Sequence, residues 1–251
     1  MKYFIHISYK GTAYHGWQLQ KNAHTVQAEL NRALQLLLGE PVATFGCGRT
    51  DTGVHAHRFT VHFEAQQCIN AQKFIQKVNK ILPPDIACHA VQPVPDTANA
   101  RFDAISRTYK YFIAYAKHPF LTEYTFHLHC TLNVEAMNSA ARLLTHMADF
   151  TSFAKLHGNA KNNLCSVYEA YWSKDEENNL LVFTIKANRF LRNMVRAIVG
   201  TLLDVGRDKL SVEDFERIAD SKNRCCSSDS APAHGLFLWE VEYRKDIPNA
   251  E

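Results

Sequence analysis

The sequence predicts an α+β protein of two halves that repeat one order of elements, strand-helix-strand-strand-helix-strand. Short segments alternate apolar and polar side chains, as half-buried strands do, and longer segments repeat apolar residues at helical spacing. The two kinds of segment follow each other in the same order twice, so each half is expected to be a split β-α-β unit of ferredoxin-like or RRM-like type. The chain has 251 residues, 46% of them hydrophobic, which is enough to bury a core in each half. This duplication predicts a central cleft between the halves.

The first half is expected to cover residues 1–104. Alternation over Tyr3–Tyr9 predicts a strand, and helically spaced apolar residues from Val26 to Leu37 predict a helix. A second helix, from Phe74 to Leu82, should end at Pro83, because proline removes a backbone donor and blocks further turns. Ile86–Val94 is expected to be the closing strand.

The second half is expected to cover residues 105–251 and to repeat the order. Its expected strands and helices are Arg107–Ala116, Val134–Met147, Ser166–Lys174, Leu180–Ala187, Arg189–Val205 and Leu236–Arg244. A short additional helix should begin at Ser211, because Asp214 follows at the spacing of a capping box.

The segment GCGRTDTGVHAHR, residues 46–58, lies between two extended hydrophobic segments and is expected to be the crown of a hairpin-like connection. It places a single carboxylate, Asp51, among arginines and histidines on a glycine-rich loop. An isolated Asp in such a loop is usually a turn residue that bonds its own backbone, so the segment alone leaves its role open.

Charge gives a weaker signal. The formal net charge of +3, from 28 basic and 25 acidic residues, is too small to establish a polyanionic partner, so any such site must concentrate its basic residues locally. Arg189, Arg192 and Arg196 recur at helical spacing along one edge of an apolar arc. Either their aliphatic parts pack along the core while the guanidinium groups reach water, or the three arginines form a positive edge of the cleft.

Composition narrows the cellular context. The seven cysteines include no Cys-x-x-Cys pair, which favours reduced thiols over a disulfide framework. The N-terminus resembles a strand rather than a leader, and no stretch of about 18 consecutive apolar residues occurs. We therefore expect a cytoplasmic protein that does not span a membrane.

Seven separated segments carry a family resemblance. In chain order they are Tyr9–Gln18 with Gln20, Thr25–Gln27, Gly48–Ala56, Leu82–Ile86, Ala100–Ala104 with Arg107–Tyr111, Phe190–Thr201 and Ala231–Leu236. Together, and in this order, they resemble the tRNA pseudouridine synthase A family over nearly the whole chain. The resemblance implies the pseudouridine synthase fold, in which the two halves share a mixed, mainly antiparallel sheet around the cleft.

It also implies a function: isomerisation of uridine to pseudouridine in the tRNA anticodon arm at positions 38, 39 and 40, by a homodimer, without cofactor or metal. By resemblance, Asp51 is the catalytic carboxylate, Arg196 is the cation paired with it and Tyr109 lies on the target base. Arg49 would extrude or hold the nucleotide, and Leu236 would complete the substrate-binding set. The candidate phosphate contacts are Lys10, Lys21, Arg58, Arg101, Arg107, Arg189 and Arg192.

The chemistry accounts for these residue types. The N1–C1′ glycosidic bond must break and a C5–C1′ bond must form, and one ionised carboxylate suffices, whether it adds to the base, attacks C1′ or assists glycal formation. The target nucleotide must leave its stack at a cost of a few kcal/mol. Stacking on Tyr109 would return about 1–3 kcal/mol.

Three other functions fit parts of the sequence. Asp51-Thr52-Gly53 is the aspartic protease tripeptide, but it occurs once and those enzymes need two carboxylates. His55 and His57 with Asp51, and the pair His127 and His129, suggest a metal hydrolase without fixing a full ligand set. Split β-α-β units also serve as RNA-binding modules that have no activity.

Overall fold

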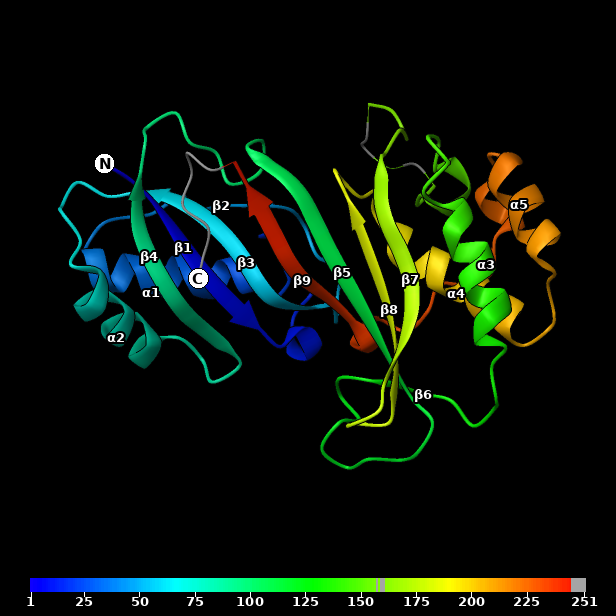
Figure 1. Ribbon diagram of the computed structural model, residues 1–251. Helices are drawn as coiled ribbons and strands as arrows, with labels where there is room; N and C mark the ends of the chain where they lie inside the picture. The colour runs from blue at the N-terminus through cyan, green and yellow to red at the C-terminus, as the bar shows by residue number, and fades with distance from the viewer. Residues whose placement is uncertain (157, 159–160, 245–251) are drawn as a thin grey trace. The chain divides into compact units, whose positions relative to one another are not determined.

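The structure is a computed structural model that describes residues 1–156, 158 and 161–244 (Figure 1). It forms two compact units. Of the described residues, the first comprises Met1–Ser106 and Phe237–Arg244, and the second lies within Arg107–Leu236.

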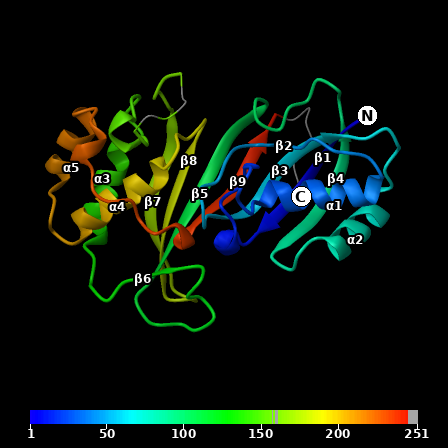
Figure 2. The same cartoon turned by 180° about the vertical axis from the view of Figure 1, so that it is seen from behind.

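The first unit has the predicted order of elements. They are β1 (Lys2–Tyr9), the 3-10 turn η1 (Gly11–Ala13), α1 (Val26–Leu38), β2 (Phe45–Gly46), β3 (His55–Glu64), α2 (Ala71–Ile81), β4 (Ile86–Val94) and β9 (Leu236–Tyr243). Its strands lie in the order β4-β1-β3-β9; β1 is antiparallel to both β3 and β4, whereas β9 runs parallel to β3. In Figure 2, α1 and α2 lie over one face of these strands.

Local signals explain where these helices begin and end. The Thr25 side chain accepts a hydrogen bond from the Ala28 N–H at the start of α1, and Gly39 ends the helix with φ 76°. Helix α2 stops at Ile81, one residue before the extended Leu82 that precedes Pro83. The predicted termination by proline is confirmed.

The second unit follows the predicted order with small additions, except that its predicted closing strand, β9, groups with the first unit. Its elements are β5 (Ala104–Ala114, of which Arg107–Ala114 belong to this unit), β6 (Phe126–His127), α3 (Val134–Leu143), η2 (Thr151–Phe153), β7 (Val167–Asp175), β8 (Leu180–Ala187), α4 (Met194–Gly206), α5 (Val212–Asp220), η3 (Arg224–Cys226) and η4 (Ala233–Gly235). Strand β8 lies antiparallel between β5 and β7, and β6 pairs parallel with β5. The α+β class with mixed, mainly antiparallel pairing is thus confirmed, and so is the Ser211 capping box of α5.

The prediction of a helix from Arg189 is wrong at its start. Helix α4 begins at Met194, because Asn193 adopts the left-handed conformation with φ 64° and interrupts the helical path. Arg189 and Arg192 therefore precede the helix, and Arg196 alone of the three predicted arginines lies on it. The predicted edge of three arginines along one helix does not exist.

Helix α4 is the central helix of the second unit. Its residues are almost all buried, among them Ile198, Val199 and Leu202, and it packs against α3 and α5. The burial of α4 fixes the position of Arg196 in its first turn.

Of the helices in the described residues, none combines the length and apolar character that a membrane crossing requires.

Candidate active site

Asp51 lies on a loop of the first unit that connects β2 to β3. The two strands pair antiparallel, with Phe45 opposite His62, so the predicted hairpin-like connection is confirmed. Within the loop, the Val54 N–H donates to the Asp51 carbonyl at 3.1 Å, and Gly53 takes φ 77°. Asp51 is half-buried on this turn and Arg49 is exposed.

The segment that follows β1 holds this loop by main-chain hydrogen bonds. The Trp17 N–H donates to the Thr50 carbonyl, and the Gly53 N–H donates to the Tyr14 carbonyl, each at 3.3 Å. The hydroxyls of Tyr9 and Thr50 are hydrogen-bonded at 2.8 Å. The motif segments Tyr9–Gln18 and Gly48–Ala56 are thus hydrogen-bonded to each other. Asp51 lies between Thr50 and Gly53, which both bond the first segment.

Two glycines allow this close approach. A Cβ atom on Gly16 would lie 2.4 Å from the Thr50 carbonyl oxygen, and Gly16 itself has φ 86°. A Cβ atom on Gly11 would lie 2.0 Å from the Val54 carbonyl oxygen. No side chain fits at either distance, so both positions require glycine while the loop keeps its place.

The loop histidines take part in ring stacking. His55 is buried, its Nδ1 accepts from the Gly11 N–H at 3.0 Å, and its ring stacks on Phe237. The exposed His57 stacks on Trp239 with centroids 4.2 Å apart. In the described part of the chain, no group of three or more His, Cys, Asp or Glu side chains is placed to bind a metal ion. The metal-hydrolase alternative thus gains no ligand set from the described residues.

Arg196 is fixed within the second unit by the backbone of Ala231. Its Nε donates to the Ala231 carbonyl at 2.7 Å, and the Ala231 N–H donates to the Arg196 carbonyl at 2.9 Å. Because a guanidinium is planar, holding Nε orients the whole group. Arg196 is half-buried.

The two tyrosines Tyr109 and Tyr111 project from the same side of β5, because they are two residues apart on one strand. Tyr111 is fully buried and donates its hydroxyl to the Pro232 carbonyl at 3.0 Å. Burial raises the pKa of Tyr111, and the positive charge of Arg196 acts in the opposite direction. Tyr109 is half-buried and meets the edge of the Phe190 ring, with centroids 5.0 Å apart.

Leu236 is buried directly after the segment Ala231–Gly235. A Cβ atom on Gly235 would lie 2.8 Å from the Tyr111 ring, so this segment rests directly on Tyr111. The second unit therefore gathers Tyr109, Arg196 and Leu236 around the Tyr111 side of β5. The structure places Arg49 and Asp51 in the first unit, and the pairing of Asp51 with Arg196 stays a prediction.

The candidate phosphate contacts differ in exposure. Lys21, Arg58, Arg101 and Arg192 are exposed, whereas Lys10, Arg107 and Arg189 are half-buried. Several also have partners within their own unit. Arg58 forms an ion pair with Glu240 at 3.6 Å, Arg107 donates to the Asn188 carbonyl at 2.9 Å, and the Arg101 guanidinium lies 5.6 Å from the centre of the Phe102 ring. Their contact with phosphate stays a prediction.

Sequence reasoning missed the residues that support the site. Gly16 and Tyr111 lie inside quoted motifs, but the pattern alone assigns them no role. Arg224, which bonds the segment leading to Ala231, belongs to no motif, and periodicity gives no signal for side chains that bond backbone.

Comparison with known proteins follows the same segments. A family model described as tRNA pseudouridine synthase matches residues 140–244. The tRNA pseudouridine synthase A of Bacteroides thetaiotaomicron is 49% identical over 251 residues, which is all of this chain and 93% of that protein. The chain belongs to the tRNA pseudouridine synthase A family. The enzymes of the same name from Bacillus licheniformis and Bacillus subtilis are 40% and 37% identical over 241 residues, or 94% of this chain.

Membership of the tRNA pseudouridine synthase A family confirms the resemblance read from the seven sequence segments. The relatives span both units, so the similarity includes the loop of Asp51 as well as helix α4. The family comprises isomerases that convert uridine to pseudouridine in tRNA.

Proposed function

We propose that this protein isomerises uridine to pseudouridine in the anticodon stem-loop of tRNA, at positions 38, 39 and 40, with Asp51 as the catalytic carboxylate. The observation that carries the proposal is the similarity of the whole chain, at 49% identity, to a tRNA pseudouridine synthase A. The packing of Tyr9–Trp17 against the Asp51 loop supports it, because catalysis by a single carboxylate needs that group held in one place.

Each site residue has a role in this proposal. The carboxylate of Asp51 acts on the base or on C1′, and the guanidinium of Arg196 favours the ionised form of that carboxylate. Tyr109 stacks on the extruded uracil, and Leu236 supplies an apolar contact. Arg49 is exposed at the tip of the loop, where it can occupy the space that the flipped nucleotide leaves.

The reaction is balanced without any oxidant or second substrate. The N1–C1′ bond breaks, the uracil rotates, and C5 forms the new bond to C1′. The hydrogen on C5 leaves as a proton, and N1 gains one. The chain's own groups can supply the charge and the orientation that these steps need, so the proposal includes neither a cofactor nor a metal.

The assay follows from the lost hydrogen. Wild-type protein should release tritium from tRNA labelled at uridine C5, and Asp51→Ala should bind tRNA but release none. Asp96→Ala is the matched control, because Asp96 is an exposed carboxylate of the same unit outside the loop. Release by Asp51→Ala at the wild-type rate would remove Asp51 from the mechanism. Binding without release by wild type would favour an RNA-binding module.

The proposal extends to assembly and location. We expect a homodimer in the cytoplasm, the first from the family resemblance and the second from its tRNA substrate and reduced thiols. All seven cysteines are thiols, and Cys47, Cys88 and Cys165 are buried. Light scattering on the purified protein measures the mass directly; a monomer at micromolar concentration would contradict the dimer.

A further inference from the structure

Arg224 bonds repeatedly to the segment that fixes Arg196. We propose that Arg224 is a positioning residue for the isomerisation: it holds the loop Ser227–Pro232 on helix α4, so that the Ala231 backbone orients the Arg196 guanidinium. The inference rests on the proposed role of Arg196 and goes beyond it by naming the group that sets its geometry.

The Arg224 guanidinium makes four hydrogen bonds within a span of four residues. Its Nη1 donates to the carbonyl oxygens of Ser227 and Ser228 at 3.3 and 3.2 Å, and to the Ser227 hydroxyl at 2.8 Å. Its Nη2 donates to the Ser230 hydroxyl at 3.0 Å. Bonds from a charged donor are about twice as strong as neutral ones. The Arg224 side chain thereby bonds three of the four residues from Ser227 to Ser230.

The opposite side of this loop lies on helix α4. The Asn193 amide donates to the Ser230 hydroxyl at 2.6 Å, and the Ser228 N–H donates to the Thr201 hydroxyl at 3.3 Å. A Cβ atom on Gly200 would lie 1.9 Å from the Asp229 carbonyl oxygen, so the loop backbone touches the helix at a position that only glycine permits. These contacts set the register of the loop along α4, and the reciprocal bonds of Ala231 and Arg196 come directly after them.

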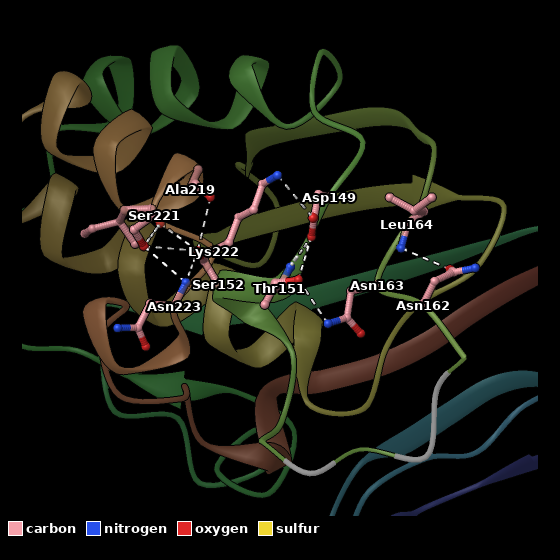
Figure 3. A network of polar contacts seen from close by, with 11 residues as sticks. Asp149, Thr151, Ser152, Asn162, Asn163, Leu164, Ala219, Ser221, Lys222 and Asn223 are labelled. Carbon is pink, nitrogen blue, oxygen red and sulfur yellow. Dashed lines mark hydrogen bonds and ion pairs between the residues drawn. The ribbon is translucent and has the colours of Figure 1, made fainter.

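Arg224 itself has a fixed base. Figure 3 shows a polar network that includes Asn223, the residue before Arg224; in it the buried Ser152 is bonded to the end of α5 and to Asn223. The Ser152 hydroxyl donates to the Ile218 carbonyl at 2.7 Å and accepts from the Asn223 N–H at 3.1 Å. The Ser227 hydroxyl donates to the Ser152 carbonyl at 2.7 Å. Asn223 and Ser227, which lie on either side of Arg224 in the chain, are therefore both bonded to Ser152 of η2.

The geometry explains why a distant arginine affects the reaction. The Nε–H of Arg196 has a backbone carbonyl as its partner, so any shift of Ala231 rotates or displaces the guanidinium. A displacement of about 1 Å in a catalytic group can slow a reaction about 100-fold. Loss of the Arg224 bonds leaves the middle of the loop, Ser228–Ser230, held mainly by its contacts to α4, and this part of the loop then samples other positions.

The test compares Arg224→Ala and Arg224→Lys with Arg217→Ala, whose arginine is exposed on α5 and bonds Asp214 instead of the loop. We expect Arg224→Ala to lower the single-turnover rate of tritium release by about 10- to 100-fold at saturating tRNA. The tRNA dissociation constant should stay within about threefold of wild type. Arg224→Lys should recover part of the rate, and Arg217→Ala should match wild type.

A second measurement reports on the loop without using activity. The Ala231 amide bonds the Arg196 carbonyl, so its hydrogen exchange should accelerate in Arg224→Ala and stay slow in Arg217→Ala. If Arg224→Ala does not fold, Ser230→Ala removes the shared acceptor of Arg224 and Asn193 and should show both effects in milder form.

The outcomes separate this inference from the proposed function. If Arg196→Ala abolishes release while folded Arg224→Ala keeps the wild-type rate, the positioning role is refuted and the function stands. If Arg196→Ala keeps the wild-type rate, the proposed role of Arg196 fails, whatever Arg224 does. If both variants are slow, Arg224→Ala should have little further effect in the Arg196→Ala background, because the two residues act through one group. Additive losses would refute the coupling.

Discussion

Replacing Gly16 with alanine should slow the reaction by moving the backbone that carries Asp51. The new Cβ atom would lie 2.4 Å from the Thr50 carbonyl oxygen and 3.2 Å from the Asp51 carbonyl carbon. Carbon and oxygen atoms do not approach below 3.0 Å in this way, so the loop must retreat by at least about 0.6 Å. A displacement on that scale should lower kcat by about 10- to 100-fold.

The same substitution also strains the backbone, and the two effects can be separated. Gly16 has φ 86°, where an L-residue costs about 1–2 kcal/mol. Gly39→Ala is the matched control, because Gly39 has φ 76° but no atom lies within 4 Å of its added Cβ. Gly39→Ala should lose stability by about 1 kcal/mol and keep full activity.

Urea unfolding and tritium release from labelled tRNA measure the two effects. Rates are compared per folded molecule, at a temperature where both variants are folded. Equal rates for Gly16→Ala and Gly39→Ala would refute the reasoning, because the loop position would then not control the chemistry of Asp51. A slower rate in Gly16→Ala alone supports it.

Three further predictions use other parts of the chain. Burial lowers the pKa of His6 to about 4, so below pH 6.5 the unfolded chain takes up a proton that the native state excludes. Stability should then fall between pH 6.5 and about 4 by up to about 3 kcal/mol, and urea unfolding of His6→Gln should show a flatter profile; parallel profiles would contradict this. Ser211→Ala should destabilise the protein by about 1 kcal/mol through loss of the α5 capping box, and an unchanged Tm would count against it. Tyr109→Phe should stay partly active because the ring remains, whereas Tyr109→Ala should lose about 1–3 kcal/mol of stacking, measured as the single-turnover rate; equal rates for the two would exclude stacking.

Periodicity and caps predicted the first half closely. Strand β4 occupies the predicted Ile86–Val94, and α1 ends at Leu38, directly before Gly39, because these boundaries are set by residues that act locally. The start of α4 was predicted five residues too early. Leu191 and Met194 continue the apolar spacing across a turn, and only the tertiary contacts of Asn193 with Ser230 reveal that the helix has not yet begun.

The candidate site divides in a similar way. Asp51 and Tyr109 could be named because they lie in contiguous motifs that carry the family resemblance. The role of Gly16 depends on a backbone 34 residues away in the chain, and that of Arg224 on bonds to serine hydroxyls and carbonyls. Such interactions repeat no pattern in the sequence, so a structure is needed to find them.

The loop of Asp51 is secured by peptide groups, through the N–H of Trp17 and the carbonyl of Tyr14, more than by the side chains around it. Every amino acid has a backbone carbonyl, and every one except proline has a backbone N–H. A substitution of a neighbouring residue, such as the exposed Thr52, therefore leaves these hydrogen bonds intact. Substitutions at the exposed tip of this loop can therefore change the side chains that it presents, while the backbone that carries Asp51, the proposed catalytic residue, stays in place.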